Sequence, residues 1–131
     1  ISALKYLEQQ REGLPKQFAS GVGRNYFTDG QYIGVLLERA SMLGKPRDYI
    51  EAISVSEKSV ADFPKSSAAW LARAQVLSTI HLFDKAKRAL DSAEKLGARK
   101  KKVMSGRATI ALALDNFDEA LKIRSKEVAE D

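Results

Sequence analysis

The chain has no cysteine and only one histidine among its 131 residues. The missing cysteine excludes disulfide bridges, thiolate metal sites and cysteine nucleophiles, although it does not identify the compartment. His81 has no second metal ligand, base or nucleophile around it, so we interpret it as a solvated side chain in a turn between two helices. We therefore predict no catalytic residue, no metal ligand and no cofactor, and we expect the chain not to be an enzyme.

Long apolar runs are missing as well, which excludes a membrane span on the sequence alone. The apolar content of 44% and the charged content of 30% are typical of a soluble, folded chain. The chain begins at Ile1 without a methionine, so we expect a trimmed N-terminus; we favour the cytoplasm and leave the periplasm open. The net charge of +5 allows an anionic partner.

Small and aromatic residues recur at a fixed interval of 34 positions. Three series share this interval: Ala40, Ala74 and Ala108; Ala52, Ala86 and Ala120; Tyr49, Phe83 and Phe117. A period of this length is typical of a helix-turn-helix solenoid. Alanine at matched positions has a physical reason, because a small side chain lets two helices approach closely. The pattern therefore predicts an all-α fold in which each repeat buries its apolar face against its neighbours.

The register divides the chain into one domain, 1–131, with four segments. We predict repeats at 33–66, 67–100 and 101–131, the last of them truncated, and an N-terminal helical hairpin or degenerate repeat at 1–32. The stretch from Thr28 to Gly30 indicates a turn. Asp48 and Asn116 each precede a glutamate by three residues, which predicts a capping box at the start of a helix, and Ser66 or Ser67 is expected to cap the helix that follows.

These residues resemble the tetratricopeptide repeat (TPR) family over 33–128. The second repeat carries most of the pattern, with Trp70, Ala74, Leu77, Phe83, Ala86, Leu90 and Ala93. The resemblance implies a right-handed α-solenoid of antiparallel helix pairs, a TPR-like superhelix. The sequence departs from the family at several places: Ser56 and Ser59 replace larger or apolar residues, and Arg39, Arg73 and Arg107 replace leucine.

The resemblance also implies a concave groove, lined by first helices, that binds a peptide or a partner's helix. The groove positions map to Leu37, Ser41, Leu71, Gln75, Ser78, Lys102, Ser105 and Thr109. Only Lys102 matches the carboxylate clamp of co-chaperone members, so recognition of a chaperone tail is not favoured. Trp70 is expected in the core, with a binding platform as the alternative, and the cluster of Tyr26, Phe27 and Tyr32 is either packing or an interaction surface.

A basic rim, formed by Arg99, Lys100 and Lys101, adjoins Lys102. Cations at a helix start oppose the helix dipole, so one interpretation is a solvated turn with the helix beginning slightly later. The other is contact with an anionic partner, such as an acidic peptide, lipid headgroups or nucleic-acid phosphate. The absence of aromatic residues near the run argues against stacking on single-stranded nucleic acid, so nucleic acid is not favoured as the partner.

We therefore expect a non-catalytic protein-protein interaction scaffold, a segment of a larger protein, that binds another protein through a peptide or helix. One alternative is a self-association module that forms a homo-oligomer. A second is a helical domain attached to an enzyme, a secretion or polysaccharide-export machine, or a regulator, whose activity lies outside this chain. A third is an anion-binding module.

Overall fold

The structure, a computed structural model, describes residues 13–114 and 121–126, and all its regular elements are helices. The all-α prediction is confirmed for this part of the chain. The helices are helix 13–20, α2 (Tyr26–Leu43), α3 (Pro46–Asp62), α4 (Ser67–Thr79), α5 (Phe83–Lys95), α6 (Lys100–Ala113) and helix 121–126. None of the described helices is both long enough and apolar enough to cross a lipid bilayer.

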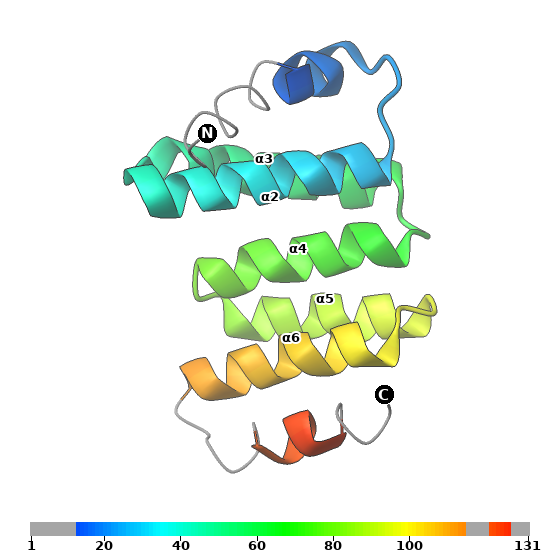
Figure 1. Ribbon diagram of the computed structural model, residues 1–131. Coiled ribbons are helices and arrows are strands. Elements are labelled where there is room, and N and C mark those ends of the chain that lie inside the picture. Colours follow the sequence, from blue (N-terminus) through cyan, green and yellow to red (C-terminus); the bar gives the residue numbers. More distant parts are fainter. Residues whose placement is uncertain (1–12, 115–120, 127–131) are drawn as a thin grey trace.

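The helices follow one another through space in chain order, from helix 13–20 at the top of Figure 1 to helix 121–126 at the bottom. Consecutive helices from α2 to α6 pack against each other, and α4 also contacts both α2 and α6. No contact joins α2 to α6 or α3 to α5 among these five helices. The first helices of the predicted repeats, α2, α4 and α6, therefore form one layer in which α4 is the centre, and α3 and α5 lie behind it.

The recurring alanines lie where these helices meet. Ala40, Ala74 and Ala108 on the first helices and Ala52 and Ala86 on the second helices are all buried. Ala120 lies outside the described residues. A first core cluster is formed by side chains of α2, α3 and α4 (Tyr32, Ile33, Leu36, Leu37, Ala52, Val55 and Val76). A second is formed by side chains of α4, α5 and α6 (Ala74, Leu77, Ala86, Ala89, Leu90, Val103 and Ile110). Each cluster is thus built from three successive helices.

Gly106 marks a close approach of α6 to α5. A Cβ atom built on Gly106 would lie 2.8 Å from Cδ2 of Leu90, which is closer than packed carbon atoms allow. Leu90 is buried in the second core cluster. The absence of a side chain at Gly106 therefore lets α6 pack directly on the Leu90 side chain.

The start of α2 differs from the prediction. Thr28–Gly30 was predicted as a turn, but these residues lie in the first turns of α2. The Asn25 side chain accepts hydrogen bonds from the backbone N–H groups of Phe27 and Thr28, and the Asn25 N–H donates to the Thr28 hydroxyl. This capping box satisfies the exposed helix donors and so favours helix over turn. The first helix of the first repeat consequently begins at Tyr26, not at residue 33.

The segment before α2 contains one described helix, 13–20, and no hairpin can be judged because residues 1–12 lie outside the described residues. Leu14 and Phe18 of this helix pack against the first core cluster. Gly21 and Gly23, at φ 77° and 70°, then form the turn that leads to α2. Helix 13–20 therefore covers the end of the first core cluster.

The start of α3 also differs. Asp48 was predicted as the N-cap, but α3 begins at Pro46, with Lys45 as N-cap and no side-chain cap. Proline suits the first helical position because its φ is already helical and its missing N–H is not needed there. Asp48 lies in the first turn instead, where it is buried and 3.1 Å from Nε of Arg39. The predicted cap at Ser66 is confirmed, whereas the predicted capping box at Asn116 lies outside the described residues.

Candidate functional site

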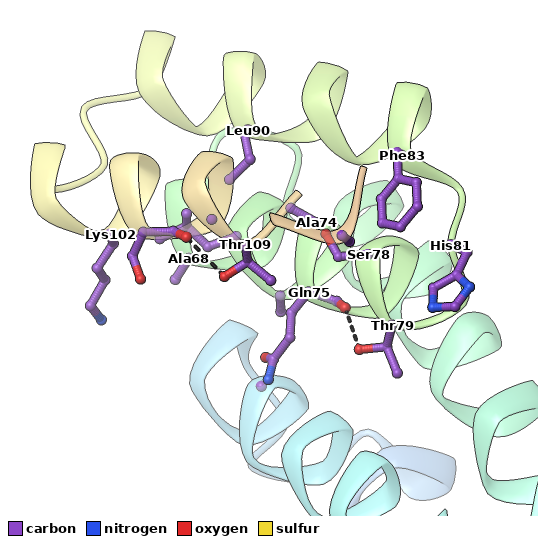
Figure 2. Close-up of a pocket in the computed structure, with 16 residues that line it drawn as sticks. Ala68, Ala74, Gln75, Ser78, Thr79, His81, Phe83, Leu90, Lys102 and Thr109 are labelled. Carbon is purple, nitrogen blue, oxygen red and sulfur yellow. Dashed lines mark hydrogen bonds between the residues drawn. The ribbon is translucent and has the colours of Figure 1, made fainter. Parts of the chain in front are cut away.

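A groove of about 750 Å³ runs along α4 and α6. One wall is α4, from Ala68 to Thr79, and the other is α6, from Lys102 to Ala113. Phe83 and Leu90 of α5 line it between these walls, and Gly30 is the contribution of α2. Figure 2 shows Lys102 at one end of the groove and His81 at the other, with Gln75 and Thr109 between them.

The two walls are built from equivalent positions of successive repeats. Five lining residues of α4 each have a lining residue on α6 exactly one 34-residue period later, in the pairs Ala68 and Lys102, Leu71 and Ser105, Ala72 and Gly106, Gln75 and Thr109, Thr79 and Ala113. Helices that share a register turn the same face to the same side. The groove is therefore a consequence of the repeat.

The lining of the groove is small and nearly uncharged. Lys102 is the only charged side chain among the described lining residues, and alanine, glycine, serine and threonine make up most of the rest. The Thr79 hydroxyl donates to the carbonyl oxygen of Gln75 at 2.8 Å, and the Thr109 hydroxyl donates to that of Ser105 at 3.0 Å (Figure 2). Both threonine hydroxyls therefore use their proton within their own helix.

Six of the eight predicted groove residues line this groove: Leu71, Gln75, Ser78, Lys102, Ser105 and Thr109. The other two, Leu37 and Ser41, do not line it. Leu37 is buried in the first core cluster, against which Ala72 of α4 also packs, so its side chain is used for packing. Ser41 is exposed near the end of α2.

The sequence prediction missed several lining residues. Thr79 and Ala113 lie one helical turn beyond Gln75 and Thr109, and their spacing of 34 could have identified them. Gly30 could not have been found in this way, because the residue 34 positions later, Pro64, does not line the groove.

The basic rim begins α6 directly. Arg99 is the N-cap, and Lys100 and Lys101 are the first helical residues, so the expectation that the helix starts later is wrong. All three side chains are exposed, as is Lys102. The rim therefore places positive charge beside the Lys102 end of the groove.

His81 lies in the turn between α4 and α5, as predicted, in the left-handed region at φ 65°. Its ring stacks on Phe83, with centroids 5.3 Å apart and planes 22° from parallel. Both residues line the groove, which the sequence prediction for His81 did not include. In residues 13–114 and 121–126, no cluster of three histidine, aspartate or glutamate side chains could hold a metal ion.

The predicted aromatic residues separate into packed and exposed groups. Trp70 is half-buried against the second core cluster, and its indole N–H donates to the carbonyl oxygen of Pro64 at 2.9 Å. Tyr32 is buried against Phe18. Phe27, in contrast, is 64% exposed. Tyr32 is therefore not available as an open binding surface, whereas Trp70 is partly exposed.

Arg24 organises a cluster at the N-terminal end that the sequence did not reveal. Its guanidinium pairs with the buried Asp29 at 2.8 Å and with Asp62 at the end of α3. It also lies over the rings of Phe18 and Phe63, at 4.7 and 5.2 Å from their centroids. Burial lowers the pKa of Arg24, but the hydrogen bonds with the two carboxylates outweigh it and raise that pKa overall. One side chain thus links helix 13–20, α2 and α3.

Arg73 and Arg107 make equivalent contacts between repeats. Arg73 of α4 pairs with Glu57 of α3 at 3.9 Å, and Arg107 of α6 pairs with Asp91 of α5 at 2.8 Å. The two arginines are 34 residues apart, and so are their partners. These two arginines therefore join α4 to α3 and α6 to α5.

The serine departure at Ser56 in α3 also has a role in this contact. The buried Ser56 hydroxyl accepts a hydrogen bond from the Arg73 guanidinium at 3.0 Å and donates to the carbonyl oxygen of Ile53 at 2.9 Å. A larger apolar residue at this position would remove the acceptor from Arg73.

Comparisons of the chain with protein families, with curated proteins and with solved structures found no match. The function is therefore inferred from the geometry of the groove.

Proposed function

We propose that the chain is a TPR-like α-solenoid, a right-handed superhelix of antiparallel helix pairs, that acts as a non-catalytic protein-interaction scaffold. The observation that carries the proposal is the groove between α4 and α6, whose walls come from equivalent positions of two repeats. Grooves that receive a helix or an extended peptide are a recurring way in which one protein recognises another. The partner in this proposal is another protein, which contributes a peptide or a helix.

Several features support a binding role over a catalytic one. The groove offers hydroxyl, amide and ammonium groups from separate helices, but it brings no carboxylate to His81 or Lys102 among the described lining residues. A general base needs a second group to orient it or to receive its proton. The His81 ring instead packs on Phe83.

A selection of displayed random peptides on the immobilised 131-residue chain tests the proposal. Peptides that are enriched should bind the wild type and should lose about tenfold or more in affinity on Thr109→Trp, because the larger side chain would fill the groove. Thr109 is exposed and lines the groove. Ser54→Trp is the matched control, since Ser54 is exposed on α3 and does not line the groove.

Equal binding of the enriched peptides to wild type, to Thr109→Trp and to Ser54→Trp would place the binding surface elsewhere and contradict the proposal. Failure to enrich any peptide would contradict it as well. Far-UV circular dichroism of both tryptophan variants establishes that the helices are intact before binding is compared.

A further inference from the structure

We infer that the occupant of the groove is a partner helix rather than an extended peptide, with small apolar residues on its contact face and an acidic residue opposite Lys102. This inference rests on the proposed function and specifies the partner of the same site.

The shape of the groove fits a helix. Its walls, α4 and α6, are in contact with each other, and the chain runs in the same direction along both of them (Figure 1). The lining residues span twelve positions on each wall, from Ala68 to Thr79 and from Lys102 to Ala113, and the rise from the first to the last is about 16 Å. A third helix of about three turns could lie along both walls over this whole length, as helices do when their side-chain ridges fit a groove.

The hydrogen-bonding groups of the groove do not suit an extended peptide. Each residue of an extended chain brings an N–H and a C=O that need partners when they leave water. The Thr79 and Thr109 hydroxyls already donate to backbone carbonyls of their own helices. Among the described lining residues, Gln75 alone has a side-chain amide, which can both donate to and accept from a peptide bond. A helix satisfies its own backbone and needs none of these groups.

The sizes of the wall residues favour a close approach of two backbones. Ala68 and Ala72 on α4 and Gly106 and Ala113 on α6 carry at most one methyl group, and Leu71 and Gln75 are the larger side chains of the α4 wall. A helix with large side chains on its contact face would be held away from this surface, whereas one with alanine, serine or glycine could settle on it. The lining thus selects small residues on the partner.

Charge complementarity fixes one further feature of the partner. Lys102 is exposed at one end of the groove, and Arg99, Lys100 and Lys101 continue the positive charge beyond it (Figure 2 shows Lys102). At the other end lie His81 and Thr79, with no cationic side chain among the described lining residues. An aspartate or glutamate at one end of the partner helix would therefore face the only strong charge of the groove.

Two displayed libraries separate a helix from an extended peptide. The first presents peptides of about four turns whose fixed positions favour helix, with random residues along one face. The second presents the same random residues with proline at every fourth position, so that no helix can form. Each is selected on the wild-type chain, and the enriched peptides are tested on Thr109→Trp, with Ser54→Trp as the control.

We expect groove-dependent binders from the helical library, with alanine, serine or glycine on the contact face and an acidic residue near one end. Lys102→Glu should weaken them by about tenfold, whereas Lys85→Glu, at an exposed position of α5 outside the groove, should change little. Groove-dependent binders that come only from the proline library would overturn the helix inference and leave the proposed function standing. The absence of groove-dependent binders from both libraries would overturn both.

Discussion

Replacing Gly106 with alanine sets two opposing effects against each other. Alanine is favoured over glycine in a helix interior by about 1 kcal/mol. However, the new Cβ would lie 2.8 Å from Cδ2 and 3.2 Å from Cδ1 of Leu90, which is 2% exposed and has little space to move. Overpacking of this kind costs about 1–3 kcal/mol. The two effects together predict a change in the free energy of unfolding between no change and a loss of about 2 kcal/mol.

Gly34→Ala is the matched control for this prediction. Gly34 also lies inside a helix, α2, but a Cβ there would meet no atom within 4 Å. This variant should gain about 0.5–1 kcal/mol, because only the helix preference changes. Since that preference is common to both variants, the difference between them isolates the overpacking of Leu90, which we expect to be about 1–3 kcal/mol.

Urea unfolding followed by far-UV circular dichroism measures both free energies. If Gly34→Ala and Gly106→Ala raise the unfolding midpoint equally, Leu90 does not fill the space beside Gly106. This result would contradict the close approach of α6 to α5 at Gly106.

Three further predictions concern charged groups. Arg24→Gln should lower the free energy of unfolding by about 3 kcal/mol in the same urea assay, because it leaves the buried Asp29 without its arginine. Asp62→Asn should cost less, because Asp62 is exposed. The hydrogen bonds from Arg24 and Arg107 hold the pKa values of Asp62 and Glu94 below their ordinary 3.8 and 4.5. Because a lowered carboxyl pKa stabilises the fold at a pH above the pKa of the unfolded chain, the stability should fall as the pH is lowered below about 5. A thermal midpoint that rises on acidification would contradict this. Replacing Lys100–Lys102 with serine should slow the association of an acidic groove peptide and reduce the salt dependence of the association rate, with a smaller effect on dissociation. Binding kinetics at low and high salt measure both rates, and an unchanged association rate would contradict the prediction.

The resemblance to the TPR pattern, with its 34-residue spacing, predicted more of the site than of the helix starts. The groove positions that the resemblance implies include Gln75 and Thr109, which are one period apart, and both line the groove. The same resemblance also implied Leu37, but that side chain is buried in the first core cluster. Spacing predicts on which face of a helix a residue lies. Whether the residue is exposed depends on which other helices cover that face, and the local sequence does not show this.

Helix starts were mispredicted where two local signals compete. The Thr28–Gly30 stretch has turn-forming residues, yet the hydrogen bonds between Asn25 and Thr28 start a helix there. At α3 the aspartate signal of Asp48 competes with Pro46, and the proline sets the first helical position. Both signals are present in the sequence, but their relative strength depends on the packing that follows.

The Arg24 cluster could not be predicted in the same way. Its members come from helix 13–20, the turn after it, α2 and the end of α3. Asp62, the second carboxylate that pairs with Arg24, is 38 residues away from it in the sequence. No period or motif connects these positions. Such a cluster appears only once the chain has folded.

The most direct test of the groove is an NMR titration of the isotope-labelled chain with a helical peptide enriched on it. Binding as described predicts chemical-shift changes concentrated at the backbone amides of Gln75, Ser78, Ser105 and Thr109, which line the groove. The amides of Ser54 on α3 and Lys87 on α5, which do not line it, should change little. Shift changes confined to Arg99–Lys101 and the exposed face of α5, with the groove amides unchanged, would contradict the groove as the binding site.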